Sequence, residues 1–267
     1  MAWQTLFGRE PQGFFIPYRY AASVEPVASA SMQALFADRN NTFQNRLDHI
    51  ASLADELSGL DGPPPLPRFD QDWFTGLDAC AAYSIVAERQ PNKIIEIGSG
   101  HSTRFLAHAV QQKSPGTSIT CVDPAPRRDI SNLPVTHKPA LISLAERDLL
   151  EDFAPNDLLF IDSSHIAMPG TDVDMIFNEF LPTLPEGALV HVHDIFLPAP
   201  YPETWSWRGY SEQMLVAALL NTASWDVVFS SYYVRANPSA FQLPELTKQL
   251  KTPAQALETS LWMIKTG

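Results

Sequence analysis

The sequence Lys-Ile-Ile-Glu-Ile-Gly-Ser-Gly-His-Ser occupies residues 93–102 of this 267-residue chain. Its apolar half is typical of a buried strand, and the stretch from Ser102 to Ala109 is predicted to be helical. Gly98 and Gly100 lack the Cβ atoms that would collide with a ligand close to the backbone. A strand, a glycine turn and a helix in this order favour a nucleotide-like cofactor bound at the turn.

Two carboxylates accompany this turn. Glu96 can accept hydrogen bonds, which suits a cofactor with cationic or hydroxyl groups better than a pyrophosphate. The dinucleotide fingerprint would also require glycine at the position of Thr103, so an NAD-dependent oxidoreductase is the less favoured alternative. Asp123 ends the next apolar segment, 27 residues after Glu96. This is close to the interval of about 20 residues at which such folds place a carboxylate on a ribose, so Asp123 is a candidate ribose ligand.

Composition restricts the class of protein. Hydrophobic residues make up 45% and charged residues 18%, which is typical of a globular chain. The formal charge of −12 opposes binding to nucleic acid or to anionic membranes, so we expect a small-molecule substrate. Two cysteines without a spaced framework, and the lack of a membrane-length apolar run or a signal-peptide pattern, predict a cytoplasmic protein. The sequence leaves open whether the chain forms a homo-oligomer.

The chain is predicted to have two parts. Apolar residues between Ser31 and Leu57 follow a helical period that is interrupted near Asn40. Residues 61–67 contain four prolines and form a stiff linker. We therefore expect an N-terminal arm and helical appendage over residues 1–67 and a catalytic domain over residues 68–267. Residues 1–29 show no steady period and are predicted to be either a lid or an assembly arm.

Beyond the linker, a helix is predicted from Asp72 to Gln90, and strands and helices then alternate. This alternation predicts an α/β fold, a doubly wound Rossmann-like sheet of about seven strands. We expect it to be mostly parallel, with the last two strands forming an antiparallel pair at one edge. The predicted strands are residues 93–97, 118–122, 135–137, 157–162, 188–194, 226–234 and 258–264.

The ordered motifs resemble those of class I S-adenosylmethionine-dependent methyltransferases. They are IIEIGSGHST (94–103), CVDP (121–124), DLLFID (157–162) and GALVHVHD (187–194), and the resemblance covers roughly residues 70–267. The family usually has a third glycine where this chain has Ser102. The resemblance implies S-adenosyl-L-methionine as cofactor, with Glu96 near its methionine amino end, Gly98 and Gly100 beneath it and Asp123 on its ribose. The cofactor-binding residues that it implies are Glu96, Gly98, Ser99, Gly100, Ser102 and Asp123.

A metal site is predicted at the ends of two strands. DSSHIAMPGTDVD (162–174) and HVHDIFLPAPYPETW (191–205) are similar to a bacterial subgroup related to metal-dependent small-molecule O-methyltransferases, although catechol-type relatives usually have Asn where this chain has Ile195. Asp162 and Asp194 end successive predicted strands, and neighbouring strands lie about 4.8 Å apart. A divalent cation such as Mg²⁺ or Mn²⁺ would relieve their repulsion, with His193 as a further ligand; histidine ligands favour Mn²⁺, Fe²⁺ or Zn²⁺ over Mg²⁺. A metal-free site is the alternative.

Histidines near the same edge are candidates for proton transfer. His191 and His193 lie two residues apart and face the same side of a strand, with His193 nearer the edge. His193 is the first choice for a general base because the unperturbed imidazole pKa is about 6.5, and His165 is its competitor. Asp162 completes the predicted catalytic set. His191 is expected to be a core residue.

Residues 201–210 are unusually aromatic and follow the strand that ends at Asp194. Substrate-binding loops lie at this position in open α/β sheets, so we interpret the segment as a substrate wall. Its predicted contacts are Tyr201, Trp205, Arg208 and Tyr210. A packing patch or a dimer contact is an equally open interpretation.

The favoured reaction is transfer of the sulfonium methyl group to an oxygen, or less favourably a nitrogen, of a small molecule. Two alternatives remain open. One is a metal-dependent hydroxylase on the same fold, with Fe²⁺ held by Asp162, His193 and Asp194. The other is a non-catalytic cofactor-binding assembly protein that associates through residues 1–60.

Overall fold

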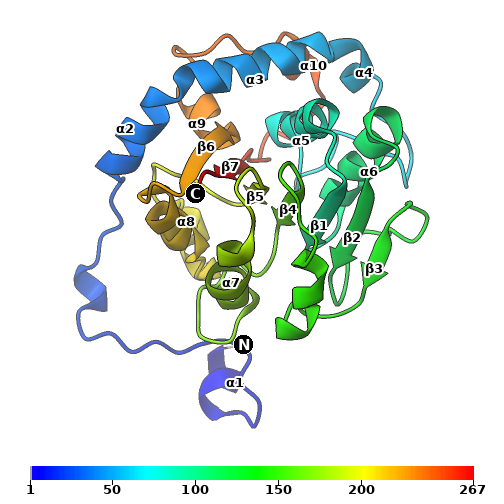
Figure 1. Ribbon diagram of the computed structural model, residues 1–267. Coiled ribbons are helices and arrows are strands. Elements are labelled where there is room, and N and C mark those ends of the chain that lie inside the picture. The colour runs from blue at the N-terminus through cyan, green and yellow to red at the C-terminus, as the bar shows by residue number, and fades with distance from the viewer. Residues whose placement is uncertain (1) are drawn as a thin grey trace.

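A seven-stranded sheet forms the centre of the computed structural model, which describes residues 2–267. The strand order is β3-β2-β1-β4-β5-β7-β6 (Figure 1). The strands are β1 (Lys93–Ile97), β2 (Ser118–Val122), β3 (Thr136–Lys138), β4 (Leu158–Ile161), β5 (Leu189–Val192), β6 (Trp225–Ser230) and β7 (Leu261–Lys265). The predicted α/β sheet is thus confirmed, and each strand lies within or close to its predicted range.

Strand β7 is the reversed strand of the sheet. It pairs antiparallel with β5 on one side and with β6 on the other, whereas the pairs of β1 to β5 are all parallel. The last two strands therefore form the expected antiparallel pair, but β7 is inserted one place in from the edge and β6 is the edge strand. Strand β6 is shorter than the predicted 226–234, because the Ser230 hydroxyl accepts a hydrogen bond from Tyr233 N and begins helix α9 (Ser231–Ala236).

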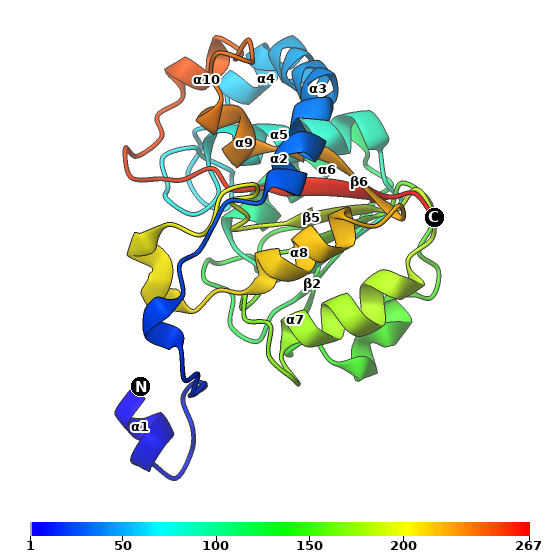
Figure 2. The ribbon, with the colours of Figure 1, turned by 90° about the vertical axis from the view of Figure 1, so that its left-hand side faces the viewer.

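Helices cover both faces of the sheet (Figure 2). Helices α5 (Gly76–Arg89) and α6 (His101–Lys113) pack together on one face, and α7 (Asp172–Met175) and α8 (Glu212–Leu220) lie on the other. The remaining α-helices are α1 (Ala2–Phe7), α2 (Ala30–Asp38), α3 (Asn40–Ser52), α4 (Ala54–Ser58) and α10 (Leu246–Gln249). Short 3-10 turns cover residues 21–23, 144–150, 181–183 and 203–208, and a π-helical turn covers residues 176–180.

The turn after β1 adopts the conformation that its glycines predict. Gly98 has φ +84°, and a Cβ atom there would lie 1.9 Å from the backbone oxygen of Asp162. The backbone nitrogen of Gly98 donates to Val122 O (3.0 Å), and Asp162 N donates to Ile97 O (2.8 Å). The turn therefore holds the ends of β1, β2 and β4 together, which brings Asp123 and Asp162 to one edge of the sheet.

The N-terminal helices pack on the α/β body. The predicted helix over residues 31–57 is observed as α2, α3 and α4, with the expected break at Arg39. Phe36 and Phe43 are fully buried, and the ring of Phe43 lies 5.9 Å from that of Phe229 in β6. Because these side chains belong to the same buried cluster as the sheet, the appendage shares one core with the body. The division at residue 67 stays a prediction.

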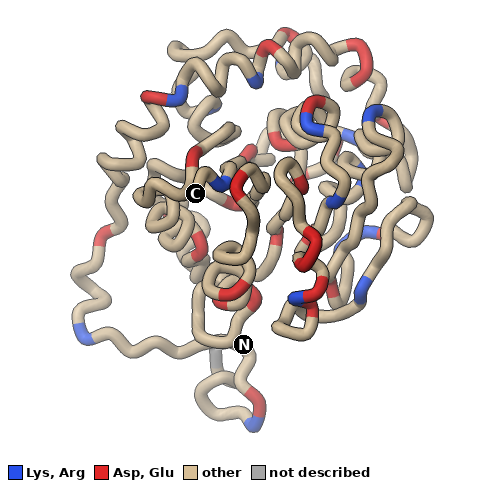
Figure 3. The backbone as a smooth tube through the Cα atoms, viewed as in Figure 1, with Lys and Arg blue, Asp and Glu red and all other residues tan. Residues whose placement is uncertain are grey.

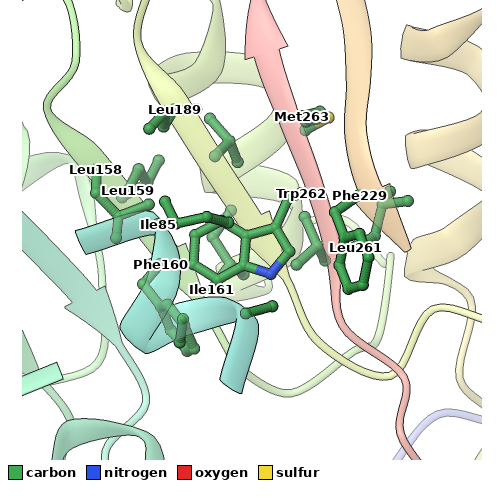
Figure 4. Packing of buried hydrophobic residues seen from close by; sticks show 14 of the residues in the cluster. Ile85, Leu158, Leu159, Phe160, Ile161, Leu189, Phe229, Leu261, Trp262 and Met263 are labelled. Atoms are coloured by element: carbon green, nitrogen blue, oxygen red, sulfur yellow. The ribbon is translucent and has the colours of Figure 1, made fainter. Parts of the chain in front are cut away.

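The core lies between the sheet and its helices (Figure 4). Trp262 of β7 and Phe160 of β4 are fully buried and meet edge to face, with ring centroids 5.9 Å apart. Ile85 of α5 and Leu189 of β5 pack around them. Burial of this apolar surface is the main force that fixes the strand order.

Residues 2–29 leave the body as an arm that carries α1 (Figures 1 and 2). Ser29 N donates to Pro198 O (2.9 Å) where the arm joins the body. The predicted lid or assembly role of the arm stays a prediction. Its exposed large hydrophobic residues are Trp3, Leu6, Phe7, Phe14, Phe15, Ile16, Tyr18, Tyr20, Val24 and Val27.

The surface charge is spread over the molecule. Figure 3 shows acidic and basic positions interspersed along the chain. The net charge of −12 is therefore not the property of one segment. Within residues 2–267, no helix has the length and apolar character needed to cross a bilayer.

Candidate active site

Three cavities open at the carboxyl edge of the parallel strands. The first, of about 230 Å³, lies beside the glycine turn and is lined by Gly98, Ser99 and Asp123. The second, of about 280 Å³, is lined by His165, His193 and Asp194 together with residues of the aromatic segment. The third is a narrow space of about 30 Å³ at the start of α6. Asp162 and Arg127 line all three cavities, so the three spaces meet at these side chains.

Asp123 follows the end of β2 and lines the first cavity. Its predicted contact with a ribose stays a prediction. Its Oδ2 accepts a hydrogen bond from Ser99 N (2.7 Å) and its Oδ1 accepts one from Ala125 N (2.7 Å). Each carboxylate oxygen can accept a further bond, so Asp123 can still bind hydroxyl groups in the first cavity. Ser99 and Gly98 line the same cavity, whereas Gly100 and Ser102 line the third.

Glu96 points into the protein. Its side chain is fully buried, accepts hydrogen bonds from Ser102 Oγ (2.6 Å) and Cys121 Sγ (3.2 Å), and does not line any of the three cavities. Burial raises the pKa of Glu96 to about 7. In this arrangement Glu96 fixes the start of α6 on β2, and its predicted contact with the methionine amino group stays a prediction.

Four predicted residues come together in what we call the acid–imidazole cluster: Asp162, His165, His193 and Asp194. Asp162 Oδ1 lies 3.4 Å from His165 Nε2 and 3.4 Å from His193 Nδ1. Asp194 contacts the same two nitrogens at 3.5 Å, through Oδ2 and Oδ1 respectively. The predicted meeting of these side chains at one sheet edge is therefore observed. Asp162 is the most accessible of the four, with 33% of its side chain exposed.

Each imidazole is held from behind by a carboxylate that the sequence analysis missed. His165 Nδ1 lies 2.9 Å from Glu212 Oε2 of α8, and His193 Nε2 lies 3.3 Å from Asp78 Oδ2 of α5. Both carboxylates are fully buried. The available signal was a charged residue on the apolar face of a helix, because Asp78 is surrounded by Leu77, Ala79 and Cys80 in the sequence.

The cluster favours protonated imidazoles. Burial disfavours the charged form of His193, but the negative charges of Asp162 and Asp194 outweigh it and hold its pKa well above the usual 6.5. The pKa of His165 is also raised well above 6.5, because hydrogen bonds to Asp162 and Glu212 outweigh burial. The pKa of Asp162 is well below its usual value, since both imidazoles outweigh the effect of burial. A general-base role for His193 at neutral pH would first require the loss of this proton.

The predicted substrate wall divides into two layers. Trp205 and Arg208 line the second cavity, and the Arg208 guanidinium lies 4.0 Å from the ring centroid of Trp205. Tyr210 and Tyr201 lie behind them: the Tyr210 hydroxyl accepts from Arg208 Nη1 (3.1 Å), and the Tyr201 hydroxyl accepts from Gln213 N (3.2 Å). The charged group that this segment contributes to the second cavity is therefore the Arg208 guanidinium, stacked on Trp205.

His191 is a core residue, as expected from its place in the strand. Its Nε2 lies 2.9 Å from Ser260 Oγ, and its ring stacks on Phe160 at 3.7 Å. Burial holds its pKa well below 6.5, so it stays neutral.

Over the part of the chain that the structure describes, no group of three or more His, Cys, Asp or Glu side chains is already arranged as a metal site. The predicted metal site is thus not preformed.

Comparisons with known proteins give one family match and several distant structural similarities. Residues 95–195 match the family model of a methyltransferase domain, and no curated protein sequence matches the chain. Three solved structures are similar at low identity. An O-methyltransferase from Bacillus cereus in complex with SAH is 14% identical, with a TM-score of 0.45 over 84% of this chain and 91% of that one. TomG from Streptomyces achromogenes, in complex with SAM, is 17% identical (TM-score 0.44, covering 83% and 90%), and SAH-bound PaMTH1 from Podospora anserina is 13% identical (0.44, 96% and 100%).

The matched segment runs from β1 to the residue after Asp194, so it contains the glycine turn, Asp123 and the acid–imidazole cluster. The family match falls on the part of the fold that builds the first cavity, and the sheet has the expected mixed, mostly parallel order. The resemblance seen in the motifs is confirmed over residues 95–195, which match a methyltransferase domain.

Proposed function

We propose that the chain is an S-adenosylmethionine-dependent methyltransferase that acts on an oxygen atom of a small molecule bound in the second cavity. The observation that carries the proposal is that all three cavities meet at Asp162, next to two imidazoles. A donor in the first and third cavities and an acceptor in the second would come into contact there and nowhere else along the edge. Such alignment of two reactants is the main contribution that a methyltransferase makes to its reaction.

The first cavity suits the adenosyl part of the donor. Asp123 keeps free acceptor capacity for the ribose hydroxyls, and Gly98 leaves its backbone accessible at the cavity wall. Leu141 and Ile142 offer apolar surface to a base at the far side of the same cavity. When bound, S-adenosylmethionine supplies an electrophilic methyl group on sulfur. The chain's own residues need only hold it with that methyl group toward Asp162.

The acid–imidazole cluster suits an oxygen acceptor. With both imidazoles protonated, His165 and His193 provide N–H groups next to the exposed oxygens of Asp162. An acceptor that releases its hydroxyl proton to solvent and binds there as an alkoxide or phenolate carries negative charge on oxygen, and buried cationic donors stabilise such charge. An amine nitrogen uses its only lone pair in the new bond and becomes a cation, so it could not accept hydrogen bonds from the imidazole N–H groups as an oxygen can. The cluster therefore supports an oxygen nucleophile over a nitrogen one.

A divalent metal ion is the second form that this site could take. Asp162, Asp194 and His193, with His165 beside them, supply two carboxylates and two imidazoles, a donor set that suits Mn²⁺, Fe²⁺ or Zn²⁺ better than Mg²⁺. The favouring observation is that Asp78 and Glu212 hold the second nitrogen of each imidazole, as carboxylates often do behind metal ligands. When bound, a metal ion would lower the pKa of the acceptor hydroxyl.

The proposal is tested with S-adenosylmethionine labelled in its methyl group and a panel of phenols, catechols and aliphatic hydroxy acids, with amines alongside. We expect label on oxygen, and we expect Asp162→Asn to reduce transfer by more than about tenfold because it removes a charge at the meeting point of the cavities. Asp152→Asn, at an exposed aspartate, is the matched control. Label on nitrogen alone, or full activity of the Asp162 variant, would refute the oxygen assignment.

The metal is tested separately. Protein purified with a chelator is assayed with and without added Mn²⁺, Fe²⁺, Zn²⁺ or Mg²⁺, and the bound metal is measured by elemental analysis. Stoichiometric binding that is lost in His193→Ala supports the metal form. Activity that is indifferent to chelator and to every added ion supports the metal-free form.

A further inference from the structure

Four basic side chains gather at the start of α6, and we call them the basic cradle. His101 and Arg104 come from α6, Arg128 comes from the loop after β2, and Arg68 comes from the segment before α5. Burial lowers the pKa of both His101 and Arg104, and the charges of Arg68 and Arg128 lower these two pKa values further. None of these three arginines forms an ion pair with a carboxylate among residues 2–267, although the chain has thirty acidic residues.

The proton position on His101 follows from its neighbour. Arg128 Nε lies 3.1 Å from His101 Nε2, and an arginine can only donate, so His101 Nε2 accepts. Burial, together with the nearby arginines, lowers the pKa of His101 to about 4, so the ring is neutral at pH 7. A neutral imidazole that accepts at Nε2 carries its hydrogen on Nδ1. His101 Nδ1 is buried and has no partner, in a side chain only 4% exposed.

Two further donors in the cradle lack a partner. Arg104 Nε is buried without a hydrogen bond, in a residue only 3% exposed, and Arg68 Nε is also buried without one, in a partly buried residue. Buried N–H groups are normally satisfied, so three such groups in one cluster indicate a missing acceptor. Because the arginines also repel one another, the acceptor that suits them best is an anion.

The basic cradle borders the third cavity. His101 and Arg128 line that cavity together with Gly100 and Ser99 of the glycine turn. The third cavity shares Asp162 and Arg127 with the first and second cavities, so it adjoins both of them. An anion held by the cradle can therefore belong to a ligand whose other end takes part in methyl transfer.

We propose that the basic cradle binds an oxyanion, a carboxylate or a phosphate, that forms part of one of the two reactants. Guanidinium groups recognise such oxyanions by paired, charge-assisted hydrogen bonds, and the His101 Nδ1 hydrogen provides a further donor. Two sources share this chemistry: the carboxylate of the donor's methionine and an acidic group of the acceptor. The inference rests on the proposed function, because both reactants must share the three cavities.

The donor source is tested by calorimetry with S-adenosylhomocysteine and with 5′-methylthioadenosine, which keeps the adenosine and sulfur but lacks the amino acid end. The test variant is Arg128→Gln, at an exposed residue, and the control is Arg147→Gln, at an exposed arginine far along the chain. If the cradle holds the donor carboxylate, Arg128→Gln weakens S-adenosylhomocysteine binding by about tenfold or more and leaves methylthioadenosine binding unchanged.

The acceptor source is tested with inorganic phosphate titrated into protein saturated with S-adenosylhomocysteine. Phosphate binding that Arg128→Gln abolishes, with S-adenosylhomocysteine affinity unchanged, assigns the cradle to the acceptor. The proposal is overturned if neither ligand responds to the substitution, or if methylthioadenosine binding falls as much as S-adenosylhomocysteine binding. A competition experiment on the unaltered chain adds to these two tests. If the oxyanion in the basic cradle is the carboxylate of the donor, phosphate should compete with S-adenosylhomocysteine and not with methylthioadenosine. Failure of the proposed function is a different result, namely donor binding without methyl transfer to oxygen.

Discussion

Replacement of Asp78 by alanine tests how the active site is tied to the fold. The Asp78 carboxylate is fully buried and accepts hydrogen bonds from Thr259 N (3.0 Å) and Ser260 N (2.9 Å), the two residues just before β7. The same group holds His193 Nε2 at 3.3 Å. Asp78→Ala would leave two buried backbone N–H groups without partners, and each such group costs about 1–3 kcal/mol. We expect the free energy of unfolding to fall by about 3–5 kcal/mol.

The measurement is urea unfolding followed by tryptophan fluorescence and by circular dichroism. Asp78→Asn keeps one oxygen that can accept from Ser260 N, so it should lose roughly half as much stability. Asp152→Asn, at an exposed aspartate, should unfold like the unaltered chain. A loss of less than about 1 kcal/mol for Asp78→Ala would refute the reasoning, because it would mean that the two N–H groups find other partners.

Three further predictions use the same unfolding assay. Gly98→Ala places a Cβ 1.9 Å from Asp162 O at a φ of +84°, so it should lower the free energy of unfolding by about 2–4 kcal/mol and weaken S-adenosylhomocysteine binding. Gly116→Ala, at an open position, should do neither, and equal effects of the two substitutions would contradict the clash. Phe43→Ala removes a fully buried ring between α3 and β6 and should cost about 3–5 kcal/mol in a single transition, while two separate transitions would show that the appendage unfolds by itself. Burial raises the pKa of Glu96 to about 7, so the protonated form favours the folded state, and the free energy of unfolding should fall by up to roughly 3 kcal/mol as pH rises from about 5 to 8. Glu96→Gln should lack this fall, and a variant with the same pH dependence as the unaltered chain would refute the assignment to Glu96.

The strands of the sheet could be predicted because their signal is local. Residues 93–97 and 158–161 are short apolar runs that follow turn-forming residues, and no distant contact is needed to recognise them. The end of β6 could not be predicted in the same way. Apolar residues continue through Val234, but the Ser230 hydroxyl caps a helix there, and this choice depends on how residues 231–236 pack against α3.

The acid–imidazole cluster was predictable from strand ends alone. Parallel strands end at one edge of a sheet, so Asp162 and Asp194 were expected to lie near each other on the condition that their strands are neighbours, and β4 does pair with β5. Their buried partners were not predictable. Asp78 and Glu212 lie on two helices on opposite faces of the sheet, and their contacts depend on helix rotation, which sequence spacing does not specify.

Backbone strain adds information that the sequence does not contain. In residues 2–267, four non-glycine residues have positive φ, and two of them, His165 and Asp194, belong to the acid–imidazole cluster. An L-residue pays about 1–2 kcal/mol for this conformation, and it persists only where surrounding contacts determine it. Here those contacts are the Glu212 carboxylate, which holds the ring of His165, and the Thr259 hydroxyl, whose Oγ1 donates to Asp194 Oδ1 (3.1 Å). With these backbone conformations, the side chains of His165 and Asp194 both lie in the cluster around Asp162. We therefore infer that the geometry of the site, rather than local stability, determines the backbone conformation at these two residues.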